Sequence, residues 1–405
     1  MLNKLDQLYI DRSNWRTCKL GDIASEMSVR VDNPSTSKYV RFVGLDHFKS
    51  GELKIRQWST TNNLTSSAKA FQKGDVLFAR RNAYLRRASI VEFDGCCSGD
   101  AFVLRENIEK IIPGFLVFLV NSDALWEYAI SNAAGTMSKR VKWENLANFE
   151  FKLPPKEQQS NLAELLWVTN DIVETNFIVL DKLNSFKYKV CEFFFIRGFK
   201  SKKTKKFAMF EIPDHWSIKK ISSVANVEYG ISESVANNTD PNIGWQIITG
   251  ANINLDGTFD LSKKRYIEIP KNERFFLKKG DLMFNWRSGS PEHIGKTAFF
   301  DLDGNFTFAS FILKIRCGEE LNKMFTYYLL NFLRVIEFFT KNVAKQVNFK
   351  LNANIFRDID IPIPPLVEQE EILLKLSKVD LAIKNASLKI ESSKKLQKNL
   401  INQLF

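Results

Sequence analysis

The chain has 405 residues, 44 % of them hydrophobic, and its 58 Lys and Arg against 46 Asp and Glu give a net charge of +12. This length supplies core for two or three domains, and neither a run of roughly 18 apolar residues nor a signal-peptide start occurs, so we expect a cytoplasmic protein without a membrane partner. The five cysteines form no Cys-x-x-Cys and lack histidines at ligand spacing, which indicates neither a metal site nor a disulfide framework.

The first 150 or so residues predict short strands followed by a helix. β-Branched or aromatic runs bounded by Gly, Asp or Asn predict strands at 39–44, 74–80, 88–91 and 101–105. Residues 115–130 have the length and spacing of one packed helix, and 149–153 predict a last strand. Cys96 and Cys97 are expected to be small apolar residues of a further strand.

A proline pair then introduces a long helix. Pro154-Pro155 fixes an extended segment before a helix whose first turns are acidic, which suits the positive end of the helix dipole. Apolar or small polar residues then recur every three or four positions, a spacing typical of a coiled coil rather than of a helix packed on one globular domain. The predicted buried stripe is Leu162, Leu165, Thr169, Ile172, Asn176, Val179, Leu183, Phe186, Val190 and Phe193. The basic segment 197–206 that follows is interpreted as a linker.

The second half repeats the first, 201 (Trp15 to Trp216) to 210 (Leu153 to Ile363) residues later. Lys73-Gly74-Asp75 recurs as Lys279-Gly280-Asp281, 115–130 as 325–339, and Pro154-Pro155 as Pro364-Pro365. In the second long helix the predicted stripe is Ile372, Leu376, Val379, Ile383, Ala386 and Ile390, continued after a change of phase by Leu396, Leu400 and Leu404. A repeat this long predicts two whole domains in tandem.

The predicted fold is therefore α+β: two mixed α/β domains in tandem repeat, separated by two long helices that pack on each other as a coiled coil. The expected boundaries are 1–153 for the first domain, 154–200 for the central helix, 201–363 for the second domain and 364–405 for the last helix. About 40 helical residues make a rod of roughly 60 Å, longer than the domains need for their cores, which suggests a spacer.

Polar loops differ between the two copies although the frame is shared. Drift after an old duplication is one explanation, and recognition of two different targets is the other. The positive charge favours a polyanionic partner, but charge alone leaves nucleic acid, acidic proteins and membrane surfaces open. From loop position and charge, the candidate DNA-binding residues are Arg80, Arg81, Asn82, Arg86, Arg87, Lys139, Arg140 and Lys142 in the first copy, and Trp286, Arg287, Ser288, Lys296, Lys345, Gln346 and Lys350 in the second.

Catalytic patterns are incomplete. The segment 289–297 has five residues between its glycines where a phosphate-binding loop needs four. Asp46 with Glu52 and Lys54 imitates a nuclease triad that the other copy does not repeat, and the three histidines are isolated. The Asn/Asp-Pro-Pro-Tyr motif of amino-methyltransferases is missing, as is a glycine-rich cofactor loop. We expect a binding protein with no catalytic or metal residues and no cofactor of its own.

Taken in order and in duplicate, the Lys-Gly-Asp strands, the Pro-Pro-x-x-Glu-Gln helix starts and the long helices resemble the specificity subunits of type I restriction-modification enzymes over essentially the whole chain. The second helix start, 364–369, fits this pattern closely, whereas the first carries its Glu-Gln one residue early. The resemblance implies two target-recognition domains in pseudo-twofold tandem repeat that each read half of a split asymmetric DNA site. It also implies that the conserved helices between them pack as an antiparallel coiled coil and dock methyltransferase subunits.

It also implies restriction (translocase) subunits as partners, and S-adenosylmethionine, ATP and Mg²⁺ on those partners rather than on this chain. Two alternatives remain: the specificity subunit of a fused restriction-methylation system, and a non-catalytic coiled-coil adaptor whose charge binds acidic proteins.

Overall fold

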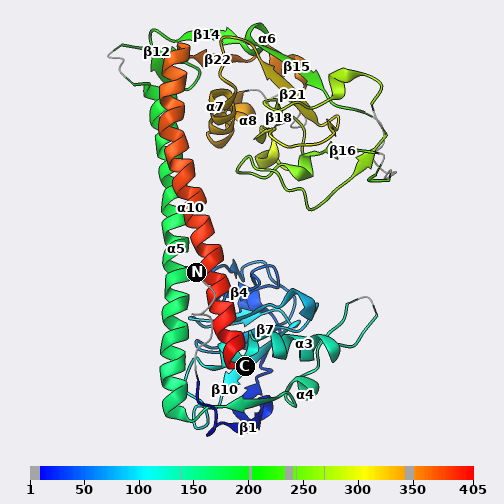
Figure 1. Ribbon diagram of the computed structural model, residues 1–405, viewed down its shortest axis with the longest axis vertical. Helices are drawn as coiled ribbons and strands as arrows, with labels where there is room; N and C mark the ends of the chain where they lie inside the picture. Colours follow the sequence, from blue (N-terminus) through cyan, green and yellow to red (C-terminus); the bar gives the residue numbers. More distant parts are fainter. Residues whose placement is uncertain are drawn as a thin grey trace. The chain divides into compact units, whose positions relative to one another are not determined.

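Figure 1 shows the computed structural model, which describes residues 10–136, 138–199, 203–232, 240–242, 244–268, 270–342 and 351–405. The chain divides into two structural units. Unit 1 comprises Met1–Leu180 and Asn385–Phe405, and unit 2 comprises Asp181–Lys384. Each unit therefore holds one mixed α/β domain and a part of each of the two long helices.

Unit 1 contains a four-stranded antiparallel sheet in the order β2-β10-β7-β8, a five-stranded sheet in the order β3-β6-β9-β4-β5 with a parallel β4–β9 pair, and the pair β1-β11. The predicted strands are present, and Cys96 and Cys97 are buried in β9 as expected. The strands are β1 (Arg16–Lys19), β2 (Ala24–Glu26), β3 (Arg30–Val31), β4 (Arg41–Val43), β5 (Ser59–Thr60), β6 (Ala68–Phe71), β7 (Val76–Ala79), β8 (Ala88–Ile90), β9 (Gly95–Cys97), β10 (Ala101–Glu106) and β11 (Glu150–Leu153). The helices are α1 (Leu20–Ile23), α2 (Leu116–Val120), α3 (Asp123–Ser131) and α4 (Trp143–Leu146), with short 3-10 turns at η1 (Pro34–Thr36) and η2 (Ala83–Leu85).

Unit 2 repeats this plan. Its four-stranded sheet runs β15-β21-β18-β19, β14 pairs with β22, and a parallel β16–β20 pair corresponds to β4–β9. The strands are β12 (Thr204–Phe207), β13 (Phe210–Pro213), β14 (Ser217–Lys220), β15 (Ala225–Tyr229), β16 (Trp245–Ile248), β17 (Tyr266–Ile267), β18 (Leu282–Asn285), β19 (Thr297–Phe299), β20 (Phe306–Phe308), β21 (Ile312–Cys317) and β22 (Asp360–Ile363). The helices are α6 (Ile221–Val224), α7 (Lys323–Val335), α8 (Phe338–Asn342) and α9 (Ala353–Arg357), with 3-10 turns at η3 (Gly250–Asn252), η4 (Glu273–Phe275) and η5 (Pro291–His293).

Three sequence-based expectations were wrong in detail. The helix predicted over 115–130 is broken into α2 and α3, because the Ser122 hydroxyl caps α3 by accepting a hydrogen bond from the Leu125 amide at 3.3 Å. The helix predicted over 325–339 is likewise divided into α7 and α8, next to Glu337 with φ of 60°. The last residues of the expected linker, 204–206, belong to strand β12, which pairs with β13. No helix among the described residues is long and apolar enough to span a membrane.

The repeated Lys-Gly-Asp motif closes a buried ion pair in each unit. The carboxylate of Asp75 in unit 1 accepts two hydrogen bonds of 2.8 Å from Arg105 of β10. The carboxylate of Asp281 in unit 2 accepts two hydrogen bonds of 2.8 Å from Arg316 of β21. The glycine before each aspartate has a φ of 92° or 94°, which a residue with a Cβ rarely adopts. The motif therefore fixes β7 against β10, and β18 against β21.

The proline-pair motif joins each long helix to its domain. Gln159 is buried, and its amide donates to the Pro154 carbonyl at 2.9 Å and accepts from the Ile112 amide at 3.0 Å. Gln369 makes the corresponding bonds to Pro364 and Asn322. The equivalent of Gln158 is thus Glu368: the Glu-Gln of the first copy lies one residue early, and Gln159 takes the structural place of Gln369.

The two long helices, α5 (Lys156–Arg197) and α10 (Leu366–Leu404), pack antiparallel in both units (Figure 1). In unit 1 the amide of Gln397 lies 3.4 Å from that of Asn170, both buried. In unit 2 the ammonium of Lys187 lies 2.8 Å from the Asp380 carboxylate. These layers occupy equivalent positions, because Asn170 and Asp380, and likewise Lys187 and Gln397, are separated by the same 210 residues as Pro154 and Pro364. The coiled coil is therefore confirmed. It contains one polar layer of two amides in unit 1 and one ion pair in unit 2, and such layers fix the register of the two helices.

The stripe predicted for α5 is only partly the one that the structure buries. The buried seam runs one residue later through much of the helix and includes Ala163, Leu166, Asn170, Val173, Cys191 and Phe194. Five predicted members at seven-residue spacing are instead 38–56 % exposed: Leu165, Ile172, Val179, Phe186 and Phe193. The helix thus carries two adjacent apolar stripes, and one remains on the surface.

The stripe predicted for α10 is largely confirmed, but the change of phase is not. Ile372, Leu376, Val379, Ala386 and Ile390 are buried. The same phase then continues through Gln397, Ile401 and Leu404, whereas Leu396 is exposed. Gln397 is therefore a polar residue at a buried position. It interrupts the hydrophobic pattern of the sequence, but the same face of α10 stays buried. A second stripe, Val367, Leu374, Leu381 and Leu388, is 52–70 % exposed.

Candidate nucleic-acid interface

Two of the loops named from the sequence meet at the end of β7 in unit 1. The amide of Val141 donates to the Arg80 carbonyl at 2.9 Å, and the amide of Asn82 donates to the Lys139 carbonyl at 3.0 Å. Arg81 and Arg140 face each other across an isolated antiparallel bridge. The structure thus brings 80–82 and 138–142, some 60 residues apart in sequence, onto one edge of the domain.

Asp100 organises the arginines at this edge. Its carboxylate accepts from Arg140 at 2.8 Å and 3.3 Å and lies 3.5 Å from Arg81, whose guanidinium also donates to the Ser138 hydroxyl at 3.2 Å. The hydrogen bond from Arg140 holds the pKa of Asp100 below its ordinary value, so the carboxylate stays charged. The side chains of both arginines remain 42 % exposed. Sequence reasoning missed Asp100, because nothing in its local pattern indicates these distant partners.

The other candidates of unit 1 differ in where their charge points. Lys139 and Lys142 are exposed, on the same edge as Arg81 and Arg140. The Arg80 guanidinium lies 5.3 Å from the centre of the Phe102 ring. Arg86 instead pairs with Asp123 of α3, which also pairs with Lys398 of α10, so this arginine faces the coiled coil. Asn82 and Arg86, with φ of 56° and 48°, bound the turn η2 between them.

In unit 2 the equivalent edge has different chemistry. Strand pairing aligns Ala79 with Ala101 and Asn285 with Ile312, so Arg81 corresponds to Arg287. By the same alignment Phe311 takes the place of Asp100. Arg287 is exposed, with its guanidinium 4.8 Å from the centre of the Phe311 ring. Trp286, which replaces Arg80, donates from its indole to the Ser310 carbonyl at 2.7 Å.

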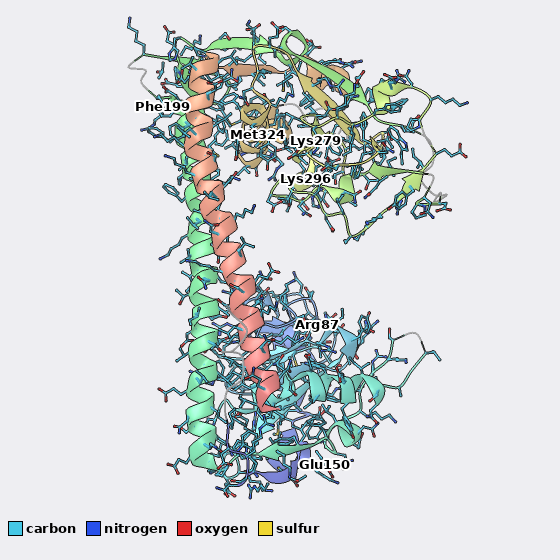
Figure 2. All side chains as sticks on the ribbon, in the orientation of Figure 1. Arg87, Glu150, Phe199, Lys279, Lys296 and Met324 are labelled. Carbon is cyan, nitrogen blue, oxygen red and sulfur yellow. The ribbon has the colours of Figure 1, made fainter. Side chains whose placement is uncertain are left out.

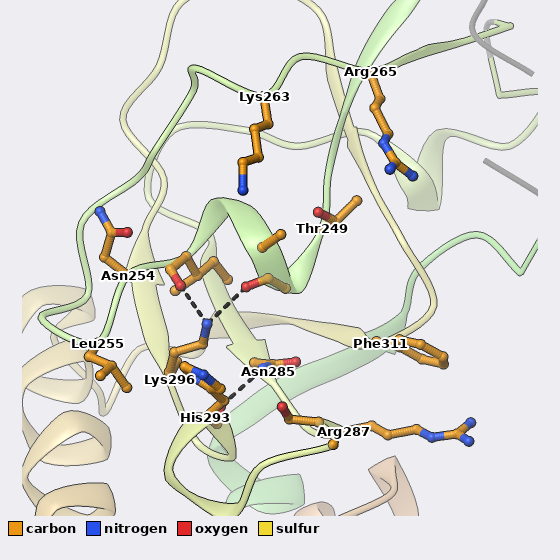
Figure 3. Close-up of a pocket in the computed structure, with 15 residues that line it drawn as sticks. Thr249, Asn254, Leu255, Lys263, Arg265, Asn285, Arg287, His293, Lys296 and Phe311 are labelled. Carbon is orange, nitrogen blue, oxygen red and sulfur yellow. Dashed lines mark hydrogen bonds between the residues drawn. The ribbon is translucent and has the colours of Figure 1, made fainter. Parts of the chain in front are cut away.

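A hollow of about 1190 Å³ adjoins Arg287 (Figure 3). Its described lining includes Ser288, carries four cations and contains no carboxylate; the cations are Lys263, Arg265, Arg287 and Lys296. Sequence reasoning missed Lys263 and Arg265, which are exposed and lie outside the loops that differ most between the copies. The buried Asn252 positions this segment by donating to the carbonyls of Asp260 and Lys263 at 2.9 Å and 3.1 Å.

Lys296 and Arg87, both labelled in Figure 2, are equivalent, and the charged group of each donates to main-chain carbonyls of its own unit. The Lys296 ammonium donates to the carbonyls of Gly250 and Ile253 at 2.9 Å and 2.6 Å, and the residue is 5 % exposed. Arg87 donates to the Leu45 carbonyl at 2.8 Å. Burial lowers the pKa of both groups. Each side chain ties the polar loop of its unit to the turn after the parallel strand β4 or β16. Lys345, Gln346 and Lys350 lie outside the described residues.

The residues of the incomplete catalytic patterns have other partners. Lys54 pairs with Glu92 at 2.8 Å, and Glu52 pairs with Lys394 of α10 at 3.1 Å. In the segment 289–297 the turn η5 lies between the glycines. Within the described ranges, no group of three or more His, Cys, Asp or Glu side chains is arranged to hold a metal ion.

Comparison with known proteins finds one matching family, the type I restriction modification DNA specificity domain, which matches residues 12–206 and again 213–392. The MjaVIII type I restriction enzyme specificity subunit of Methanocaldococcus jannaschii is 25 % identical over 298 residues, 68 % of this chain and 65 % of that protein. The chain thus matches slightly less than two thirds of this relative's length. The putative MjaX specificity subunit of the same organism is 22 % identical over 357 residues, 82 % of this chain and 77 % of that protein.

A solved structure, described as the structural basis of complex assembly and conformational transition of the type I R-M system, superposes with a TM-score of 0.58. It is 20 % identical and aligns over 98 % of this chain and 99 % of its own. At this identity the likeness concerns the fold alone.

Proposed function

Since the chain belongs to the family of type I restriction modification DNA specificity domains and carries two matching segments, we propose that it is the sequence-specific DNA-binding specificity subunit of a type I restriction-modification complex. Each recognition domain then reads one half of a bipartite, asymmetric site, and the coiled coil sets the spacer between the halves. The chain itself catalyses no reaction.

The observation that best supports this proposal is that the two units share the same arrangement of strands but carry different side chains at the edge where β7 and β18 end. Arg81 and Arg287 project from equivalent ends of equivalent strands, yet one lies beside Asp100 and Arg140 and the other over Phe311. Arginine is the side chain that most often specifies guanine in the major groove, so its orientation decides which base pair is accepted. Two copies of one frame with different arginine surroundings are suited to two different half-sites.

The remaining cations fit supporting roles. Lys139 and Lys142 in unit 1, and Lys263 and Arg265 in unit 2, are exposed cations suited to phosphate contacts, which orient the protein on the duplex without reading sequence. Arg87 and Lys296 donate to main-chain carbonyls, and we assign them to holding the loops in place rather than to contacting DNA.

The exposed apolar stripes support docking of other subunits. Leu165, Ile172 and Val179 on α5 lie one heptad apart, as do Leu374, Leu381 and Leu388 on α10. An apolar residue every seven positions is what a further helix needs in order to pack against a coiled coil. We propose that these stripes receive helices of methyltransferase (modification) subunits and that restriction/translocase subunits join that assembly.

S-adenosylmethionine, ATP and Mg²⁺ would then be bound by the partner subunits. The complex acts where chromosomal DNA lies, in the cytoplasm. A fused restriction-methylation system would use the same DNA-reading edges. The coiled-coil adaptor is the second candidate function, since the same exposed stripes would also serve a protein that binds no DNA.

Selection from a random-sequence duplex pool tests the proposal. The full chain with its modification subunits should enrich a split motif, whereas an adaptor would enrich none. Arg81→Ala should relax base preference in one half of that motif and Arg287→Ala in the other. Lys19→Ala, which removes a cation at β1, provides a charge-matched control. If either arginine variant relaxed both halves equally, the assignment of one domain to one half-site would be wrong.

A further inference from the structure

One structural position at the corresponding edges of the two units carries an acidic side chain in unit 1 and an aromatic one in unit 2. It is the residue immediately before β10 in unit 1, Asp100, and immediately before β21 in unit 2, Phe311. Its main chain has the same role in both units: the Asp100 carbonyl accepts from the Arg80 amide at 3.0 Å, and the Phe311 carbonyl accepts from the Trp286 amide at 3.2 Å. The backbone is thus conserved between the units, and only the side chain changes.

In unit 1 this side chain joins two arginines from different loops. Asp100 binds Arg140 through two hydrogen bonds and lies 3.5 Å from Arg81, and the Ser138 hydroxyl accepts a further bond from Arg81. A guanidinium has five N–H donors in a fixed plane, so a carboxylate that takes one edge restricts the direction of the remaining donors. The group of three charged side chains has a net charge of +1.

In unit 2 the equivalent side chain provides no acceptor. The Arg287 guanidinium lies over the Phe311 ring at 4.8 Å, and Phe311 is 46 % exposed beside the cationic hollow (Figure 3). Stacking on a ring restrains the guanidinium plane and leaves all five donors available. Within the described lining of the hollow, Arg287 thus has no carboxylate beside it.

We propose that the residue at this position, Asp100 in unit 1 and Phe311 in unit 2, determines the base preference of its domain by positioning the equivalent arginines Arg81 and Arg287. Asp100 and Phe311 are positioning residues, since their action passes through the arginine. The inference rests on the proposed DNA-reading function and adds to it the residues that make the two half-sites differ.

The test is selection from the random-sequence duplex pool with the full chain and its modification subunits, comparing wild type with Asp100→Asn. This variant keeps the size of the side chain and removes the charge that holds Arg140. Base preference should fall about tenfold at one or two positions of the half-site that Arg81→Ala affects. The other half-site should be unchanged, and affinity for non-specific duplex should be equal or higher, because a negative charge has been removed.

Asp32→Asn is the matched control, since its carboxylate is largely exposed and forms its ion pair with the neighbouring Arg30. In unit 2, Phe311→Leu should relax the half-site that Arg287→Ala affects, and it keeps the inference testable if Asp100→Asn does not fold. A purely structural role would instead lower affinity for all sequences together.

The inference is overturned if wild type enriches a split motif while Asp100→Asn and Phe311→Leu leave each half-site as sharp as before, or if either variant weakens all sequences equally. If wild type enriches no motif, the proposed function itself fails. The two failures are therefore distinguishable in one experiment.

Discussion

Removal of the buried aspartate of one Lys-Gly-Asp motif should destabilise one domain and spare the other. The Asp75 side chain is 3 % exposed, accepts two 2.8 Å bonds from Arg105 and accepts a third from the Gln72 amide at 2.8 Å. Breaking a fully buried ion pair costs about 3–5 kcal/mol. Because Arg105 is 36 % exposed and regains water, we expect about 2–3 kcal/mol for Asp75→Ala.

Hydrogen exchange measured by mass spectrometry resolves this loss by region. A loss of about 2–3 kcal/mol corresponds to roughly 30- to 150-fold faster exchange of the amides in β7 and β10. Asp281→Ala should produce the same change in β18 and β21, because the Asp281 carboxylate accepts two hydrogen bonds of 2.8 Å from Arg316 and one of 2.9 Å from the Lys278 amide. Asp32→Ala serves as the control with an exposed carboxylate. Equal acceleration of both sheets by either variant, or of neither, would refute the reasoning that each motif fastens only its own sheet.

The remaining predictions concern binding and geometry. Lys139→Ala and Lys142→Ala should each weaken binding to all sequences alike and reduce the dependence of log K on log salt by about one, measured by fluorescence anisotropy in a salt series; a change in the enriched motif would argue against phosphate contacts. The double variant Ile172→Glu and Val179→Glu should abolish co-purification of modification subunits while circular dichroism stays unchanged, because both side chains are exposed; Thr175→Glu on the same helix is the control, and retained co-purification would contradict docking on this stripe. Insertion of one heptad into both α5 and α10 keeps the seam in phase and adds about 10 Å, so methylation mapping should show a spacer longer by about three base pairs with unchanged half-sites; altered half-sites would contradict the separation of spacer and recognition.

Much of the scaffold could be predicted because its signals are local or repeated. Pro154-Pro155 and Pro364-Pro365 mark the starts of α5 and α10, and the two Gly-Asp dipeptides mark β7 and β18. The breaks between α2 and α3 and between α7 and α8 were missed. The first break depends on the Ser122 hydroxyl, which caps α3, and the second lies next to Glu337, whose φ is 60°; the apolar spacing that predicted one continuous helix in each copy indicates neither feature.

The candidate site could be predicted in outline only. Loop position and charge identified Arg81, Arg140 and Arg287, and they lie on equivalent edges of their domains. The same criteria also selected Lys296, whose charge is directed into the domain, and passed over Asp100, an acid beside a basic loop. Net charge indicates a polyanionic partner, but it does not show which Lys and Arg side chains form hydrogen bonds within the protein itself.

The sequence by itself determined that there are two copies of one frame, that a long helix follows each, and that each helix has heptad periodicity. These properties depend on neighbours within a few residues or on comparison of the copies. Only the tertiary structure decided which of two adjacent stripes on α5 is buried, because the choice depends on the register with α10 that the layers Asn170–Gln397 and Lys187–Asp380 fix. It also decided that Asp100 meets Arg140 and that Phe311 meets Arg287, contacts that form only when loops distant in sequence fold onto one sheet edge.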